Sequence, residues 1–435
     1  MESKMKTINI GLIGFGTVGA GVAEALLKNA ELISKRTGTM PVLKKIADLD
    51  TTTDRGVKLP DGMLINDAKQ ITDAPDIDIV VELVGGTTFA KDIILRAIRN
   101  GKSIVTANKA LIATYGQELF EEAAKHNVDI GFEASVGGGI PCIKAIREGL
   151  VGNHVKSILG ILNGTCNYIL TKMENDKADF DSVLKGAQAN GYAEANPALD
   201  VDGIDTAHKA AILASLVFGK LFTIKDVTVS GIRSVTTTDI ETASELGYKI
   251  KLLAIIKEVE NAVQLEVHPA LVPKKSLLGN VSDVFNAVWV DADVVGKTMY
   301  YGRGAGRQAT SSAVVADIVD ISLNIANDSK RRILPFPCYD DYKGIIDSSR
   351  IMSRFYIRLQ VQDKPGVLAK VSTILCNYDI SVSSVTQKEN QSPSVQMIML
   401  THNASASAMS KAIDEITKIQ EVTSAPVVFR IEDAN

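Results

Sequence analysis

The sequence predicts an α/β protein in three parts: a doubly wound parallel sheet at the N-terminus, an α+β domain in the middle and a βαββαβ module at the C-terminus. Three patterns lead to this prediction. Short apolar runs alternate with helical patterns over the first third, strand-like runs follow one another in the middle, and two helical patterns lie among alternating strands after residue 351. The 435 residues are enough for two or three domains.

The composition is typical of a soluble globular protein. There are 47 basic and 51 acidic residues, a net charge of −4, so neither nucleic acid nor an anionic membrane surface is an expected partner. The cysteines and the five histidines are scattered, which predicts neither a disulfide framework nor a zinc site. No signal-peptide pattern opens the chain and no apolar run reaches about 18 residues, so we expect a cytoplasmic protein.

A glycine-rich turn near the N-terminus predicts a dinucleotide site. Residues 7–13 form an expected buried strand, Gly14-Phe-Gly16-Thr-Val-Gly19 follows at once, and a helical pattern begins there. Gly14 would permit the tight turn, Gly16 would let the backbone approach a pyrophosphate, and Gly19 would allow the helix to pack closely on the strand. The helix N-terminus adds free N–H groups and a positive potential. The alternative is a merely structural turn.

Acidic residues after the second expected strand favour NAD. This strand covers 42–47 and ends at Asp48-Leu49-Asp50, whose carboxylates are suited to the ribose hydroxyls. The motif contains no arginine for the 2′-phosphate of NADP, although Arg55 and two lysines lie nearby. Its separation from the glycine motif is longer than usual, which predicts an extra turn or loop at 32–41. The preference for NAD over NADP is therefore weak.

Two further features of the first domain point to ligands. The parallel sheet continues with strands at 77–84, 103–106 and 129–133 and helices at 91–100 and 118–125. Lys109 follows one strand at the carboxyl edge, where ligands bind in open α/β sheets. The glycine run from Glu133 to Pro141 leaves carbonyl oxygens for a hard monovalent cation, or it is a hinge between domains. These residues alone favour neither reading.

The middle domain is expected to contain a mixed or antiparallel sheet. Its helices are predicted at 143–148, 166–175 and 180–190, and its strands at 156–162, 228–232, 251–258 and 263–269. A second glycine-rich loop, from Tyr300 to Gly306, is either functional or a tight connector. It precedes a helical pattern at 311–327 that could return to cover the first domain.

A charged pair stands on a helix that otherwise has a buried pattern, within the segment 191–218. Asp205 and Lys209 are four residues apart and share a helix face with apolar residues. A carboxylate and an ammonium group on such a face are costly to desolvate unless they are paired or used. The pair is therefore either an ordinary helical ion pair or a catalytic lysine held by carboxylates.

Together, these motifs resemble those of homoserine dehydrogenase, across the whole chain and in the right order. They are Gly14 to Gly19, Thr106-Ala-Asn-Lys109, Asn163-Gly-Thr165, Gly191-Tyr-Ala-Glu194 with Asp200, Asp205 and Lys209, and Gly302-Arg-Gly-Ala-Gly306. The family interconverts L-aspartate 4-semialdehyde and L-homoserine with NAD(P)(H), on the route to threonine, methionine and isoleucine. Two rivals stay open: another amino-acid dehydrogenase, and a non-catalytic amino-acid sensor.

The resemblance implies a role for each candidate residue. Lys209 would be the general acid/base, and Lys109 a second active-site lysine near cofactor and substrate. The substrate ligands would be Glu194, Asp205, Asp200 and Tyr192. The cofactor, NAD or NADP, would contact Gly14, Phe15, Gly16, Thr17, Val18, Gly19, Asp48, Lys109, Gly191 and Gly302. A sodium ion would bind at Glu133, Val136, Gly138 and Ile140.

The C-terminal module resembles an ACT regulatory domain. A linker at 330–350 leads to the strand pattern at 353–361, and the turn Asp363-Lys-Pro-Gly366-Val367-Leu368 follows. The resemblance implies that an amino acid binds near Asp363, Gly366, Val367 and Leu368, and threonine is the expected effector. The alternative is a module used only for dimer assembly.

We therefore divide the chain into four segments. They are a dinucleotide-binding domain at 1–141 with the returning helix at 307–329, a substrate-binding and dimerisation domain at 142–306, a linker at 330–350 and the ACT domain at 351–435. The expected protein is an enzyme that forms a homodimer or homotetramer. Its expected partners are the small-molecule substrate and the amino-acid effector.

Overall fold

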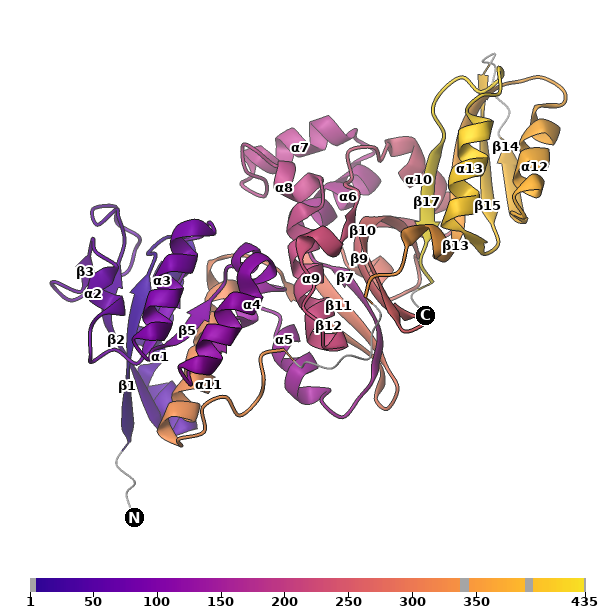
Figure 1. Ribbon diagram of the computed structural model, residues 1–435. Helices are drawn as coiled ribbons and strands as arrows, with labels where there is room; N and C mark the ends of the chain where they lie inside the picture. The colour runs from indigo at the N-terminus through magenta and orange to yellow at the C-terminus, as the bar shows by residue number, and fades with distance from the viewer. Residues whose placement is uncertain (1–4, 337–343, 388–393, 434–435) are drawn as a thin grey trace. The chain divides into compact units, whose positions relative to one another are not determined.

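The computed structural model describes residues 5–336, 344–387 and 394–433 (Figure 1). The chain forms two compact units, each assembled from separate stretches of sequence. The first comprises residues 1–164, 205–227 and 284–342, and the second comprises residues 165–204, 228–283 and 343–435.

The first unit contains the predicted parallel sheet. Its strands are β1 (Lys6–Ile13), β2 (Thr39–Ala47), β3 (Leu64–Ile65), β4 (Ile79–Glu82), β5 (Ser103–Thr106) and β6 (Ile130–Gly131), in the order β3-β2-β1-β4-β5-β6. All neighbouring strands are parallel, which confirms the doubly wound fold. Its helices are α1 (Thr17–Thr37), α2 (Lys69–Thr72), α3 (Thr88–Arg99) and α4 (Lys109–Lys125) (Figure 1).

Two sequence-based boundaries in this unit were wrong. No extra loop lies at 32–41, because α1 continues to Thr37 and ends at Gly38, whose φ of 71° is readily adopted by glycine. Helix α4 begins at Lys109 instead of residue 118. The side chain of Asn108 caps it by accepting a hydrogen bond from the Leu111 N–H. Lys109 is therefore the first residue of a helix.

Helix α11 (Arg307–Ala326) belongs to the first unit and packs against α1. The Ser311 hydroxyl donates to the Val18 carbonyl at 3.1 Å. A Cβ atom at Gly21 would lie only 2.2 Å from the Ser311 Oγ, so glycine allows this close approach. By length and composition α11 could cross a membrane, but half of its most apolar window is buried within the protein. This pattern is typical of a core helix.

The rest of the first unit includes the helix α9 (Ile204–Phe218), of which all residues except Ile204 and His208 are buried. The remaining elements are α5 (Cys142–Lys144), a π-helical turn (Ala145–Gly149), β7 (Val155–Ile161), β11 (Phe285–Ala292) and β12 (Gly296–Arg303). Strand β11 pairs antiparallel with both β7 and β12. Strands β11 and β12 were not predicted from the sequence.

The second unit begins with helices α6 (Gly164–Asp176), α7 (Phe180–Ala189) and α8 (Ala198–Val201). Strands β9 (Tyr248–Val259) and β10 (Ala262–Pro273) form an antiparallel hairpin, and β8 (Thr228–Val229) pairs parallel with β10. Helix α10 (Thr237–Glu245) was not predicted. A reciprocal capping box between Thr236 and Asp239 starts it.

The C-terminal module has the predicted βαββαβ order and lies in the second unit. Its main elements are β13 (Met352–Gln362), α12 (Val367–Asn377), β14 (Val382–Gln387), β15 (Ser394–Thr401), α13 (Ala406–Ile416) and β17 (Val427–Ile431), with a short strand β16 (Ala404–Ser405). The strands lie antiparallel in the order β17-β13-β15-β14. Strand β17 also pairs parallel with β10. Part of the predicted linker, 337–343, lies outside the described residues.

Candidate active site

Asp205 and Lys209 form a buried ion pair on the first turns of α9. The Lys209 Nζ donates to the Asp205 Oδ2 at 2.7 Å and to the Leu162 carbonyl at 2.6 Å. The Lys209 side chain is only 10% exposed, and the Asp205 side chain is 11% exposed. Ion pairs on exposed helix faces contribute little to stability and cost little to form. A buried pair such as this one carries a large desolvation cost, which its mutual attraction and hydrogen bonds must offset.

Two further segments bring polar groups to Asp205. The Lys109 Nζ, at the start of α4, lies 3.1 Å from the Asp205 Oδ1, and its side chain is 38% exposed. The Asn163 side-chain amide, just beyond β7, donates to the Asp205 Oδ2 at 2.9 Å. Asp205 therefore joins three segments that lie far apart in the sequence: the start of α4, the end of β7 and the start of α9.

The electrostatics of this cluster keep Asp205 ionised. Burial would raise its pKa, but the charges of Lys209 and Lys109 and the hydrogen bonds of Lys209 and Asn163 outweigh burial and hold that pKa well below its usual range. Two cations therefore share one anion. The resulting positive potential suits an oxygen atom that gains negative charge during a reaction.

The glycine turn between β1 and α1 fits a pyrophosphate. Gly14 has a φ of 99°, and a Cβ there would lie 2.6 Å from the Leu83 backbone. A Cβ at Gly19 would lie 2.0 Å from the Gly14 carbonyl oxygen, which shows how closely α1 approaches the turn. No atom lies within 4 Å of the Cβ position at Gly16, so this side of the backbone is open to a ligand. Phe15, Thr17 and Val18 belong to the same turn.

The carboxyl end of β2 carries both acidic and basic groups. The Asp48 Oδ2 accepts a hydrogen bond from the Phe15 N–H at 2.5 Å, so Asp48 holds the glycine turn. Arg55 folds back to lie 3.8 Å from Asp48 and 3.1 Å from Asp50, with its guanidinium over the Phe15 ring. The motif Asp48-Leu49-Asp50 has no arginine of its own, but the fold supplies one.

The candidate cation loop is organised around Glu133. Its carboxylate accepts hydrogen bonds from the N–H groups of Ile143 and Lys144, at 2.9 and 2.7 Å, where α5 begins. Burial raises the pKa of Glu133. Gly138 has a φ of 57°, and a Cβ there would lie 2.3 Å from the Gly304 carbonyl oxygen. Within the described ranges, no group of three or more His, Cys, Asp or Glu side chains could hold a metal ion. Any cation here would therefore rely mainly on backbone carbonyls, such as those of Val136 and Ile140.

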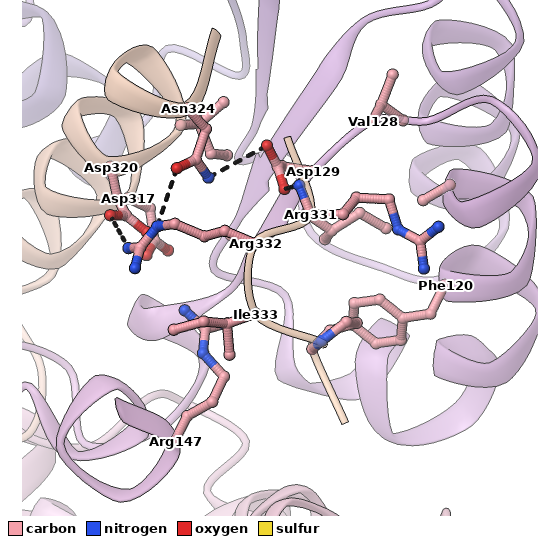
Figure 2. A pocket seen from close by; sticks show the side chains of 15 residues that line it. Phe120, Val128, Asp129, Arg147, Asp317, Asp320, Asn324, Arg331, Arg332 and Ile333 are labelled. Atoms are coloured by element: carbon pink, nitrogen blue, oxygen red, sulfur yellow. Dashed lines mark hydrogen bonds and ion pairs between the residues drawn. The ribbon is translucent and has the colours of Figure 1, made fainter. Parts of the chain in front are cut away.

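A polar cavity of about 40 Å³ lies behind this loop (Figure 2). Asp317 lies in its wall and accepts the Glu133 backbone N–H at 2.8 Å. Burial, and next the Glu133 carboxylate, raise the pKa of Asp317 to about 8. The volume is enough for a few waters but far below the roughly 300 Å³ of small ligand sites. The cavity is therefore no substrate site.

The same cavity is closed by the chain that follows α11. Arg332 donates to the Asn324 side chain at 3.0 Å and to Asp320 at 2.6 Å, and the Arg331 N–H donates to Asp129 at 2.8 Å (Figure 2). The start of the predicted linker is thus bound firmly within the first unit.

The other candidate substrate residues belong to the second unit. The Tyr192 ring lies 4.8 Å from that of Tyr168, and the Tyr192 carbonyl accepts from the Thr165 hydroxyl. Gly191, with a φ of 72°, precedes it, and the Glu194 side chain is exposed. Asp200 lies in α8, where its carbonyl accepts from the Cys166 thiol at 3.2 Å.

The remaining candidates lie on β12 and on the turn before α12. A Cβ at Gly302 would lie 3.2 Å from the Ile140 side chain, so this glycine adjoins the candidate cation loop. Gly366 has a φ of 89° and caps α12. Val367 is buried beneath the turn, whereas Asp363 and Leu368 are exposed.

Asn163 was missed as a site residue. Its motif, Asn163-Gly-Thr165, was recognised only as part of the family resemblance. The available signal was its place directly after a buried strand, where parallel and mixed sheets often present polar side chains to ligands. Its side-chain amide holds the Asp205 carboxylate through a hydrogen bond.

Known proteins resemble this chain over nearly its whole length. Family models of homoserine dehydrogenase match residues 141–319, those of its NAD-binding domain residues 14–133, and those of the ACT domain residues 355–421. A homoserine dehydrogenase from Neisseria gonorrhoeae is 43% identical, over 98% of this chain and 99% of its own. A homoserine dehydrogenase structure from Thiobacillus denitrificans has a TM-score of 0.93 at 42% identity and covers 99% of both chains.

A further solved structure bears on the cofactor. It is a hyperthermophilic archaeal homoserine dehydrogenase in complex with NADPH, which matches with a TM-score of 0.63 at 27% identity, over 73% of this chain and 98% of its own. The glycine turn and the match to an NAD-binding domain agree in indicating a nicotinamide dinucleotide cofactor. The chain belongs to the homoserine dehydrogenase family of oxidoreductases and carries a C-terminal ACT domain.

Proposed function

We propose that Lys209 is the general acid/base of this homoserine dehydrogenase. The observation that carries the proposal is the buried Lys209 ammonium group, held by Asp205 and by the Leu162 carbonyl, with Lys109 on the other oxygen of the same carboxylate. An ordinary helical ion pair does not require a second lysine or an amide from Asn163.

In the reducing direction, the Lys209 Nζ donates a proton to the aldehyde oxygen of L-aspartate 4-semialdehyde. The carbonyl carbon gains a hydride at the same time, so the product is the primary alcohol of L-homoserine. A nicotinamide dinucleotide held by the glycine turn would supply this hydride, and would accept it in the reverse reaction. Lys109 stabilises the negative charge on the oxygen, and Asp205 fixes the positions of both ammonium groups.

The polar groups of L-homoserine are assigned to the acidic motif. Glu194 binds the α-ammonium group, Asp205 accepts from the hydroxyl, and Tyr192 and Asp200 line the pocket. Carboxylates are the natural partners of an ammonium ion because the hydrogen bonds are charge-assisted. A substrate panel of L-homoserine, L-serine and L-threonine separates this assignment from another amino-acid dehydrogenase.

The cofactor is NAD or NADP. Gly14 to Gly19 bind the pyrophosphate, Lys109, Gly191 and Gly302 contact the nicotinamide half, and Asp48 is next to the adenosine ribose. Arg55 offers a cation to the 2′-phosphate of NADP, while Asp50 offers a carboxylate to the hydroxyls of NAD. We therefore expect turnover with both cofactors.

The finer features follow the family resemblance. A sodium ion binds at the carbonyls around Glu133, Val136, Gly138 and Ile140. Threonine binds the turn at Asp363, Gly366, Val367 and Leu368 and inhibits the enzyme. The protein is a cytoplasmic homodimer or homotetramer.

One experiment tests the activity and its regulation together. Purified full-length protein is incubated with L-homoserine and either NAD or NADP, with and without L-threonine and sodium chloride, and formation of reduced cofactor is followed. We expect turnover that millimolar threonine inhibits. No turnover by folded protein with either cofactor would overturn the proposed activity, and indifference to threonine would overturn the regulation.

A further inference from the structure

Two strands share one edge of β10 in the second unit. Strand β8 pairs with β10 at Glu266 and Val267, and β17 pairs with it at Ala270 and Leu271, both in parallel register. Neither ladder covers the two residues between them, His268 and Pro269. Pro269 has no N–H to offer another strand. The ACT sheet and the middle domain therefore meet on β10 with a break between them.

A cavity of about 260 Å³ occupies this break, and we call it the junction cavity. Its lining comes from the β8 segment (Thr228, Ser230, Ser234), from β10 (Glu266, Val267, His268, Pro269) and from ACT strands β13 and β17 (Phe355, Val428, Phe429, Arg430). The volume is slightly below the roughly 300–1,000 Å³ typical of drug-sized ligand sites. The cavity therefore suits a small metabolite.

One wall of the junction cavity carries opposite charges next to each other. The Arg430 guanidinium, from the ACT domain, donates to the Glu266 carboxylate, from β10. Gln264 donates to the same carboxylate at 2.7 Å. The Glu266 side chain is 3% exposed and that of Arg430 is 16% exposed. A neighbouring pair of fixed charges in a sheltered wall is complementary to a zwitterion.

His268 lines the same wall. Its Nδ1 lies 3.0 Å from the Pro269 carbonyl, which can only accept a hydrogen bond, so the Nδ1 carries the proton. The Nε2 then presents a lone pair, and this buried atom has no partner among the described residues. Burial lowers the pKa of His268, in agreement with a neutral ring. The ring therefore carries no charge beside Glu266 and Arg430, and these two side chains are the charged groups of the wall.

We propose that the junction cavity binds a small α-amino acid, with its ammonium group toward Glu266 and its carboxylate toward Arg430. The serine and threonine hydroxyls of the β8 segment complete the site. This site is separate in sequence from the ACT turn at 363–368, and it rests on the amino-acid regulation proposed above.

The same segment is tied to the candidate substrate motif. The Ile232 N–H donates to the Val201 carbonyl of α8 at 2.8 Å, and Arg233 holds Asp202 through both carboxylate oxygens. A Cβ at Gly231 would lie 2.1 Å from the Val201 carbonyl oxygen, so the two backbones are in close contact. A ligand in contact with Ser230 would therefore shift the neighbouring residues 231–233. These residues contact α8, which contains Asp200. Occupation of the cavity changes the affinity for L-homoserine by this route.

Calorimetric titration of the full-length protein tests the proposal without requiring turnover. The probes are L-threonine, L-valine and L-lactate, the last of which has a carboxylate and a hydroxyl but no ammonium group. We expect an amino acid to bind and L-lactate not to bind. Ser230→Tyr, at an exposed position, fills the cavity and should weaken amino-acid binding at least tenfold. Ser410→Tyr, an equally bulky change at an exposed serine of α13, is the matched control.

The outcomes separate this site from the ACT turn. We expect two classes of amino-acid site in the wild type, of which Ser230→Tyr removes one and Leu368→Asp the other. A Ser230→Tyr variant that keeps both classes would overturn the proposal. Binding of none of the probes, or of L-lactate as tightly as L-threonine, would also overturn it. If Ser230→Tyr fails to unfold cooperatively on heating, Ser234→Tyr replaces it. Homoserine oxidation is measured in a separate assay. A failure of the proposed activity is therefore distinguished from a failure of amino-acid binding in the junction cavity.

Discussion

Asp205 lies between two lysines: its Oδ2 is 2.7 Å from the Lys209 Nζ, and its Oδ1 is 3.1 Å from the Lys109 Nζ. Replacement by asparagine keeps the size of the side chain but removes the charge that holds both ammonium groups. We expect Asp205→Asn to lower kcat by about 10²–10³-fold. Steady-state kinetics with L-homoserine measure the effect.

The matched control is an exposed pair with the same spacing. Glu31 and Lys35 on α1 are also four residues apart, but their side chains are 80% and 73% exposed. Glu31→Gln should leave kcat unchanged and cost less than about 0.5 kcal/mol of stability. Equal losses of kcat in both variants would mean that Asp205 has no special place in the site.

Replacing two glycines of the nucleotide turn by alanine should have two different effects, one on cofactor affinity and one on stability. Gly16→Ala places its methyl group in open space, so the protein should fold normally but bind NAD(P) about tenfold or more weakly, because the methyl occupies the path of the pyrophosphate. Gly19→Ala would press against the Gly14 carbonyl oxygen, so it should lower the free energy of unfolding by about 1–3 kcal/mol. Fluorescence titration with NADH or NADPH and chemical denaturation distinguish the two effects. If Gly16→Ala binds NAD(P) with wild-type affinity, the pyrophosphate does not bind at this turn.

Arg55 should discriminate between the two cofactors. Its guanidinium lies near Asp48 and Asp50 at the end of β2, where the adenosine ribose is expected. A hydrogen bond to a charged group contributes about 1.5–3 kcal/mol, so Arg55→Leu should raise the KM for NADP about tenfold or more relative to that for NAD. Lys58→Ala, an exposed cation three residues away, is the control. Equal changes in both KM values would exclude Arg55 from contact with the phosphate.

Asp317 should make the protein less stable as the pH rises. Its pKa is raised to about 8 in the folded state from an ordinary value of 3.8, so between these values the folded protein keeps a proton that the unfolded chain has lost. Stability contributed by this group therefore falls from about pH 4 to pH 8. Asp317→Asn keeps an acceptor for the Glu133 N–H and removes the titration.

The comparison is made at pH 5 and pH 8 by chemical denaturation. We expect the loss of unfolding free energy between these values to be about 1–5 kcal/mol smaller in Asp317→Asn than in the wild type. An identical loss in both proteins would show that Asp317 does not titrate in this range.

The elements that produce a regular hydrophobic periodicity were predicted from the sequence. Alternation of buried strands and helices predicted the parallel sheet, and the turn at 363–368 predicted the module that contains Gly366. Helix α10 was missed because it is short and rich in threonine, a weak helix former, and its signal was the capping residue Thr236. The sequence did not predict the pairing of β10 with β17, because it joins residues about 160 positions apart.

Only those contacts of the site that join residues close together in the sequence were predicted. The spacing of Asp205 and Lys209 on one helix is local, so their pairing was predicted, though not its purpose. The contacts of Lys109 and Asn163 with Asp205 depend on the meeting of three distant segments. The position of Arg55 also required the fold, because the residue returns to Asp48 only through a loop.

The most direct test of the central claim is the turnover of Lys209→Ala with L-homoserine, measured together with its affinity for NAD(P)H. The account predicts that kcat falls by about 10²–10⁴-fold while the cofactor dissociation constant stays within about twofold of the wild-type value. A kcat within tenfold of the wild type, in a variant that binds cofactor normally, would contradict the account and reduce Lys209 to a structural ion pair.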